Sequence, residues 1–241
     1  MTCRVLNRQR RNDVNADMAP FVLSIQLAAM TLAVLLVIGL PLAWWLAMTK
    51  SPYKPIIEAI NALPLVLPPT VLGFYLLVFL GPQGWAGQMW TALFGQPLTF
   101  TFTGLVLASC IYSLPFVVQP LQGAFERLDR RTVEASLTLG ASWPRTFLRV
   151  VLPQARHGLL TACVLGFAHT IGEFGVVLMV GGNIPGETQV LSIAIYEHVE
   201  ALDYAAAGSM SMMLVVLSFL GLLPLYTKSR KHRRLLREVA A

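Results

Sequence analysis

The sequence predicts an all-α integral membrane protein with five transmembrane helices. Of its 241 residues, 56% are hydrophobic and only 12% are charged, whereas a soluble domain is nearer a quarter charged. The apolar residues also gather in blocks of about 20, the length at which a helix crosses the hydrocarbon core of a bilayer. Only helices and closed barrels satisfy their backbone groups there, and blocks of this length indicate helices.

Five apolar blocks define a single transmembrane domain, which we place at residues 20–227. The expected spans are residues 20–48, 56–80, 103–121, 158–180 and 205–226. An N-terminal tail, residues 1–19, precedes the domain, and a basic tail, residues 228–241, follows it. The first apolar run is too long for the core of a signal peptide, and no small-residue cleavage site closes it, so we expect a retained span.

The distribution of basic residues predicts the orientation. Fourteen of the 18 Lys and Arg residues fall after the first span, after the third span and in the C-terminal tail. By the positive-inside rule these segments face the cytoplasm, and the N-terminus lies outside. The four arginines of the N-terminal tail break the rule, and a true start at Met18 would remove the conflict. The net charge of +6 therefore indicates membrane orientation rather than nucleic-acid binding.

Common catalytic and metal-binding patterns are missing from the sequence. It contains no GxxxxGK[ST] phosphate loop and no HExxH or GxSxG motif. Its three cysteines form no CxxC or Cys/His cluster, so we expect no metal site and interpret them as small packing residues. An intramembrane hydrolase would need His169 as a base with Ser192 or Ser209 as the nucleophile, and it stays open as an enzymatic alternative.

The long cytoplasmic loop, residues 125–155, has the pattern of a helix, a break and a second helix. Asp129 or Thr132 can cap the first helix, and Ser142 can cap the second. Gly140 suits the C-terminal break between them. The expected product is a short, small-residue helix across the cytoplasmic mouth of the protein, which a partner could grip as a lever.

The residues of this loop resemble the EAA loop of ABC importer permeases. Glu134-Ala135-Ser136 is followed by Gly140 and then by Leu152-Pro153, with Ser136 where the family has a second Ala. In that family the loop forms a coupling helix that docks in a cleft of the ATP-binding subunit. The resemblance implies an ATPase-coupling role for Glu134, Ala135, Ser136, Gly140, Ala141, Phe147, Leu152 and Pro153.

Two further stretches narrow the resemblance. Gly172-Glu173-Phe174-Gly175, followed by the Gly-Asn-Ile-Pro-Gly-Glu-Thr sequence that ends at Thr188, resembles the molybdate, tungstate and sulfate group of these permeases. Residues 63–73 resemble the second span of the same group. The similarity covers nearly everything from Phe21 to Tyr226 and implies the ABC importer permease fold.

The same resemblance implies the cargo and the partners. The favoured cargo is molybdate, with sulfate or tungstate as alternatives. The expected assembly is a homodimer in the bacterial inner membrane, with two cytoplasmic ABC ATPase subunits and a periplasmic oxyanion-binding protein. ATP and Mg would bind to the ATPase, and this chain would bind no cofactor.

No Lys or Arg lies inside an expected span. Tight binding of a doubly charged oxyanion needs cationic groups or a dense set of N–H donors. We therefore expect selection by the periplasmic protein and only a transient polar route through this subunit. A passive anion channel is the alternative, and it would conduct without nucleotide.

Two segments are candidates for that route or its gate. The Pro68-Pro69 pair removes backbone donors, and broken backbone at membrane depth faces protein or a water-filled cavity; a simple packing kink is the alternative. Glu173 is the only acid deep in a span. His169, four residues earlier, should share its helix face, which favours a structural hydrogen-bonded or ion pair. The candidate residues are Pro64, Pro68, Pro69, Thr70, Gly73, His169, Gly172, Glu173, Phe174 and Gly175.

Overall fold

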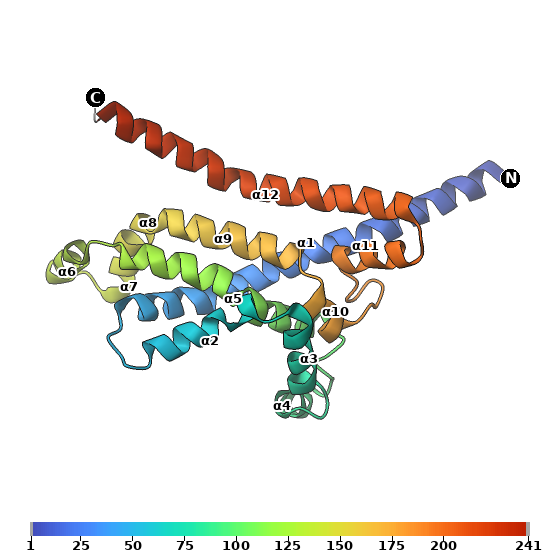
Figure 1. Cartoon of the computed structure of the whole chain (residues 1–241), viewed down its shortest axis with the longest axis horizontal. Helices are drawn as coiled ribbons and strands as arrows, with labels where there is room; N and C mark the ends of the chain where they lie inside the picture. Colours follow the sequence, from blue (N-terminus) through green and yellow to red (C-terminus); the bar gives the residue numbers. More distant parts are fainter. Residues whose placement is uncertain (1, 240–241) are drawn as a thin grey trace. The chain divides into compact units, whose positions relative to one another are not determined.

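The computed structural model describes the backbone of residues 2–239 and the side chains of residues 18–226 apart from residue 224. Every regular element of that backbone is helical, which confirms the expected all-α class (Figure 1). The elements are α1 (Thr2–Met48), α2 (Lys54–Val66), α3 (Pro69–Leu80), α4 (Trp85–Phe94), α5 (Phe102–Glu126), α6 (Arg130–Thr138), α7 (Trp143–Thr146), the π-helical turn η1 (Phe147–Val151), α8 (Leu152–Gln154), α9 (Arg156–Ile171), α10 (Gly175–Gly181), α11 (Leu191–Glu200) and α12 (Tyr204–Val239). The basic side chains of the two tails lie outside the described side chains.

Three helical stretches within the described residues are long and apolar enough to cross a bilayer: Met18–Met48, Phe102–Glu126 and Tyr204–Leu223. Two pairs of shorter helices raise the number to five if each pair counts as one span. The first pair is α2 with α3. The second is the segment Trp143–Gln154 with α9, bent by 78° at the break.

The breaks in the spans only partly match the expectation. Leu67 and Pro68 separate α2 from α3, as the prolines predict. Pro69 opens α3, where its missing N–H costs no helical hydrogen bond. The expectation of one continuous helix over residues 158–180 is wrong, because α9 ends at Ile171 and α10 begins only at Gly175.

The chain forms two compact units. Unit 1 contains residues up to Thr31, Leu67–Tyr112 and Thr170–Ser218. Unit 2 contains Leu32–Val66, Ser113–His169 and the residues from Phe219 onward. The long helices α1, α5 and α12 contribute a segment to each unit.

In unit 1, α3 packs closely against α10, beside α4 (Figure 1). A Cβ atom at Gly73 would lie 2.9 Å from the Cβ of Met179, and one at Gly175 would lie 2.7 Å from the Cβ of Pro69. Glycine at both positions therefore permits this approach. Leu76, Leu80, Leu98, Ala108, Val176 and Val180 form the adjoining core. A second core joins α11 to Met210 of α12.

In unit 2, the second half of α5 forms the centre of the core. Leu121 and Phe125 are fully buried. α9 comes close to α5, since a Cβ atom at Gly158 would lie only 2.2 Å from the Cβ of Ala124. Polar contacts join α2 to the end of α5: the Lys54 Nζ lies 3.3 Å from Glu126 Oε1, and the Gln122 amide donates to Glu58 Oε1 at 2.6 Å.

Candidate functional site

The first half of the loop at residues 125–155 forms a capped, exposed helix. The Asp129 side chain accepts the N–H of Arg131 at 3.0 Å and caps α6, so Asp129 rather than Thr132 is the cap. At the other end, Gly140 has a φ of +83°. The N–H groups of Gly140 and Ala141 donate to the carbonyls of Leu137 and Ser136, which is the Schellman pattern of helix termination. This confirms the expected break at Gly140.

The surface of α6 is available to a partner. None of its residues is buried, and Glu134 and Ala135 are exposed. Leu139, which follows α6, is 88% exposed. The loop helix therefore presents an exposed surface.

The second half of the loop departs from a regular helix. Ser142 occupies the N-cap position of α7, but its side chain makes no capping hydrogen bond. The chain continues as the π-helical turn η1, which contains Phe147, and ends in α8, which contains Leu152 and Pro153. Such π-helical turns are frequent at functional sites.

A hydrogen bond holds the two halves of the loop together. The Ser136 Oγ lies 3.0 Å from the Oγ1 of Thr146, and Thr146 is only 1% exposed. In the EAA pattern Ser136 is only a small residue in place of Ala. The pattern therefore did not predict its hydrogen bond to Thr146. The serine hydroxyl thus fixes α6 relative to α7.

An aromatic cluster fixes the second half of the loop to the spans of unit 2. The ring of Trp44, near the end of α1, lies 5.2 Å from the ring of Trp143 and 5.8 Å from that of Phe147. It also lies 5.3 Å from the ring of Phe125 in α5. Edge-to-face and tilted contacts at these separations are favourable. Trp44 therefore contacts both the loop and a spanning helix.

The proline-rich candidates differ in their environments. Pro64 is buried in unit 2, whereas Pro68, Pro69 and Thr70 are exposed in unit 1. Gly73 is buried against α10 rather than open. The structure thus leaves Pro68, Pro69 and Thr70 accessible at the break before α3.

His169 and Glu173 do not share a helix face, contrary to the expectation, because α9 ends before Glu173. His169 Nδ1 lies 2.9 Å from the Oγ of Ser113, and its ring stacks on Phe116 at 3.9 Å. The Glu173 side chain is 4% exposed, and neither of its carboxyl oxygens has a hydrogen-bond partner among the described residues.

The neighbours of Glu173 stabilise the break between α9 and α10. The backbone carbonyl of Glu173 accepts a hydrogen bond from the hydroxyl of Ser192 at 2.5 Å. The Phe174 ring packs 5.0 Å from that of Tyr196, while Gly172 is exposed. The hydroxyl of Ser209 donates to the carbonyl of Ala206. Both serines of the hydrolase alternative therefore donate to backbone carbonyls, and the described residues contain no metal-binding group of three or more candidate ligands.

Several apolar helices long enough to span a bilayer, together with the exposed loop helix α6, are the features of a multi-span membrane protein. The chain belongs to the family described as binding-protein-dependent transport system inner membrane component, whose model matches residues 39–231. Members are transporter subunits, so this chain is not an enzyme.

Two relatives show the range of similar proteins. The molybdenum transport system permease protein ModB of Azotobacter vinelandii is 55% identical over 214 residues, which cover 89% of this chain and 95% of that protein. The sulfate transport system permease protein CysT of Escherichia coli (strain K12) is 35% identical over 199 residues, which cover 82% of this chain and 72% of that protein.

Among solved structures, a bacterial ABC transporter that imports the acidic polysaccharide alginate superposes with a TM-score of 0.65. The match covers 92% of this chain and 89% of that chain at 16% identity. The likeness therefore concerns the fold, which is that of an ABC importer permease.

The aromatic cluster generates the first prediction. Replacing Trp44 with Ala should free the segment 143–149, because each lost aromatic pair contributes about 0.5–1.5 kcal/mol beyond its buried area. Trypsin cleavage after the exposed Arg145 and Arg149 should accelerate about tenfold or more, while Trp44→Phe should stay close to wild type. Trp45→Ala is the matched control, since Trp45 makes none of these ring contacts. Equal cleavage rates in all four proteins would contradict the anchoring role.

Proposed function

We propose that this chain is the permease subunit of an ATP-driven importer that carries an oxyanion, with molybdate as the cargo. The observation that carries the cargo is the 55% identity to the molybdenum permease of A. vinelandii over almost its whole length. Identity to the sulfate permease of E. coli is 35%. Sulfate and tungstate are the alternatives within the same mechanism.

The chemistry of the spans supports selection outside the membrane. The stretches Met18–Met48, Phe102–Glu126 and Tyr204–Leu223 contain no Lys or Arg. A dianion would find no fixed positive charge there to replace its hydration. A periplasmic binding protein would supply the affinity. A structure of the bacterial alginate transporter is in complex with a periplasmic protein that holds an alginate pentasaccharide. The exposed Pro68, Pro69 and Thr70 would border the route, with Glu173 near its gate.

The loop helix would couple this route to ATP hydrolysis on partner chains. Glu134 and Ala135 on the exposed face of α6, together with the left-handed Gly140, would dock against an ABC ATPase subunit that binds ATP and Mg. The Trp44 cluster would pass its motion to α1 and α5 as a rigid-body movement. One chain supplies one set of spans, so the assembly would be a homodimer with two ATPases.

Transport measurements test the cargo. We would reconstitute the complex with its ATPase and binding protein in vesicles. It should take up radiolabelled molybdate only when ATP is present on the side of the membrane that carries the ATPase. Excess unlabelled molybdate should compete at least about tenfold better than sulfate. Stronger competition by sulfate would identify sulfate as the cargo. Molybdate flux without nucleotide would identify a passive channel.

The coupling role of the loop is tested at Gly140. A Val at this left-handed position should strain the turn by roughly 1–2 kcal/mol and abolish stimulated ATPase activity and uptake, with insertion retained. Gly140→Asn should keep substantial activity, because Asn tolerates this conformation.

Gly95→Val provides the matched control for strain alone. Gly95 is also a left-handed helix cap, and no atoms lie within 4 Å of a Cβ at either glycine. If Gly140→Val and Gly95→Val transport equally well, the loop does not couple hydrolysis to transport.

Orientation is tested by labelling single cysteines in a variant that lacks Cys3, Cys110 and Cys163. By the positive-inside rule, Arg131→Cys should react with a membrane-impermeant maleimide only from the cytoplasmic side. Glu200→Cys should react only from the periplasmic side. Labelling of both positions from the same side would contradict five spans with a cytoplasmic C-terminus.

A further inference from the structure

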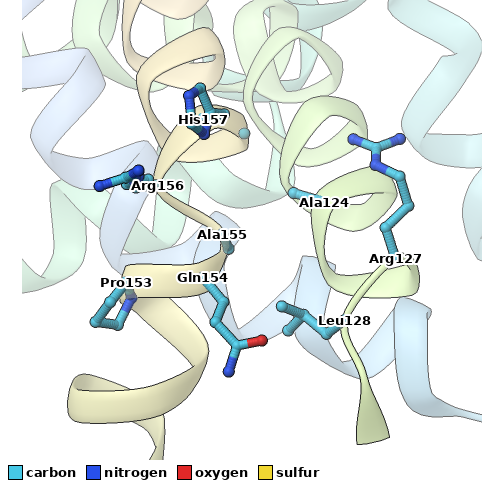
Figure 2. A pocket seen from close by; sticks show the side chains of 9 residues that line it. Ala124, Arg127, Leu128, Pro153, Gln154, Ala155, Arg156 and His157 are labelled. Atoms are coloured by element: carbon cyan, nitrogen blue, oxygen red, sulfur yellow. The ribbon is translucent and has the colours of Figure 1, made fainter. Parts of the chain in front are cut away.

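A pocket of about 550 Å³ lies in unit 2 between the end of α5 and the junction of α8 with α9 (Figure 2). The inner part is narrow, because Gly158 of α9 and Ala124 of α5 approach too closely for a side chain at residue 158. Ligand pockets commonly measure about 300–1,000 Å³. This pocket can therefore hold a phosphate-sized group together with part of the molecule to which that group is attached.

The charge of the pocket lining is positive. Arg127 stands on the α5 wall, and Arg156 and His157 stand on the α9 wall, on the other side (Figure 2). No Asp or Glu lines the pocket. Within the described part of the chain, neither arginine forms an ion pair with a carboxylate. Two arginines thus stand on opposite sides of the pocket, with their guanidinium groups toward its rim (Figure 2).

The acids closest in sequence to Arg127 already have partners. Glu126 contacts Lys54 and accepts a hydrogen bond from Gln122. The Asp129 carboxylate caps α6 by accepting the N–H of Arg131. The exposed Glu126 also interacts electrostatically with Arg127, but no ion pair joins these two residues among the described side chains.

The hydrogen-bonding groups of the lining also suit an anion. Guanidinium groups present several N–H donors that match the oxygens of phosphate and similar oxyanions. The Gln154 side chain extends from the α8 wall toward Leu128 (Figure 2), and its amide adds two further donors. Leu128 and Pro153 supply an apolar border, which an acyl chain or a glycerol group could cover.

We propose that this pocket binds a tetrahedral oxyanion group, carried either by the headgroup of an anionic phospholipid or by a free oxyanion of the cargo class. Its place at the end of one spanning helix and the start of the next fits the basic pockets that bind lipid headgroups at the cytoplasmic membrane surface. The proposal goes beyond the coupling role and does not depend on it, because Arg127 and Arg156 are outside the set of coupling residues.

Binding measurements on the purified full-length chain test this site with two probes. The first is retention of phosphatidylglycerol against phosphatidylcholine, counted by native mass spectrometry after extraction from vesicles of equal composition. The second is titration with inorganic phosphate and with molybdate in detergent free of anionic lipid. Retention of phosphatidylglycerol identifies a lipid site, and saturable binding of phosphate or molybdate identifies a free-oxyanion site.

Arg127→Gln/Arg156→Gln should lower the affinity for the probe about 30-fold, as expected for the loss of two basic residues near the membrane surface. Arg130→Gln/Arg131→Gln removes the same charge from the same loop outside the lining and should change binding less than about twofold. Arg127→Lys/Arg156→Lys, which keeps both charges, should retain most of the lipid binding. This variant separates loss of the site from loss of folding.

Three results would overturn the proposal. In the first, the wild-type chain binds neither probe, and in the second, both double Gln variants bind the probe equally well. In the third, Arg127→Gln/Arg156→Gln loses the co-purifying ATPase while probe binding is unchanged, which would make the pocket part of a protein interface.

Discussion

The requirement that backbone groups in an apolar medium find partners determines where this chain can depart from a helix. In unit 1, three hydrogen bonds supply partners for backbone groups outside the helices. The Ser192 hydroxyl donates to the carbonyl of Glu173 between α9 and α10. The N–H of Phe100 donates to the carbonyl of Val180 at 2.9 Å, and the N–H of Leu191 donates to the buried Ser24 hydroxyl at 2.8 Å. The breaks are therefore fixed parts of the structure, and short helices such as α10 and α11 can be held within a membrane protein without a continuous span.

Close packing and side-chain hydrogen bonding both position helices in this structure. Gly73 and Gly158 allow helices to approach at distances that no side chain would permit. At the loop 125–155, the exposed α6 has no core of its own, so its position depends on Ser136 bonded to Thr146 and on the rings around Trp44. Under the proposed coupling role, such a helix would face the partner on its outer surface and transmit force through its inner attachments.

Local patterns in the sequence predicted the parts of this structure that local physics determines. Apolar blocks gave the helical membrane class, and the position of Gly140 gave the helix end with its positive φ. The end of α9 at Ile171 could not be predicted, because the hydroxyl that satisfies the Glu173 carbonyl is 19 residues away in the chain. The Trp44 cluster joins residues about 100 positions apart, and the Ser136 contact depends on how α7 folds back. Pairings of this kind leave no periodic signal in the sequence. Periodicity alone therefore placed His169 and Glu173 on one helix, whereas α9 ends at Ile171, before Glu173.

The distribution of charge suits the proposed transport of an oxyanion. A cation deep in a span would offset the desolvation cost of the dianion and hold it tightly. Release of the dianion would then require a comparable energy. The stretches Met18–Met48, Phe102–Glu126 and Tyr204–Leu223 contain no Lys or Arg, while Arg127 and Arg156 stand where α5 ends and α9 begins. A weakly binding interior permits release, and positive charge at the helix ends lowers the energy of an anion that leaves by that side. Directional transport by such a subunit therefore depends on conformational change driven by its partners rather than on affinity within the membrane.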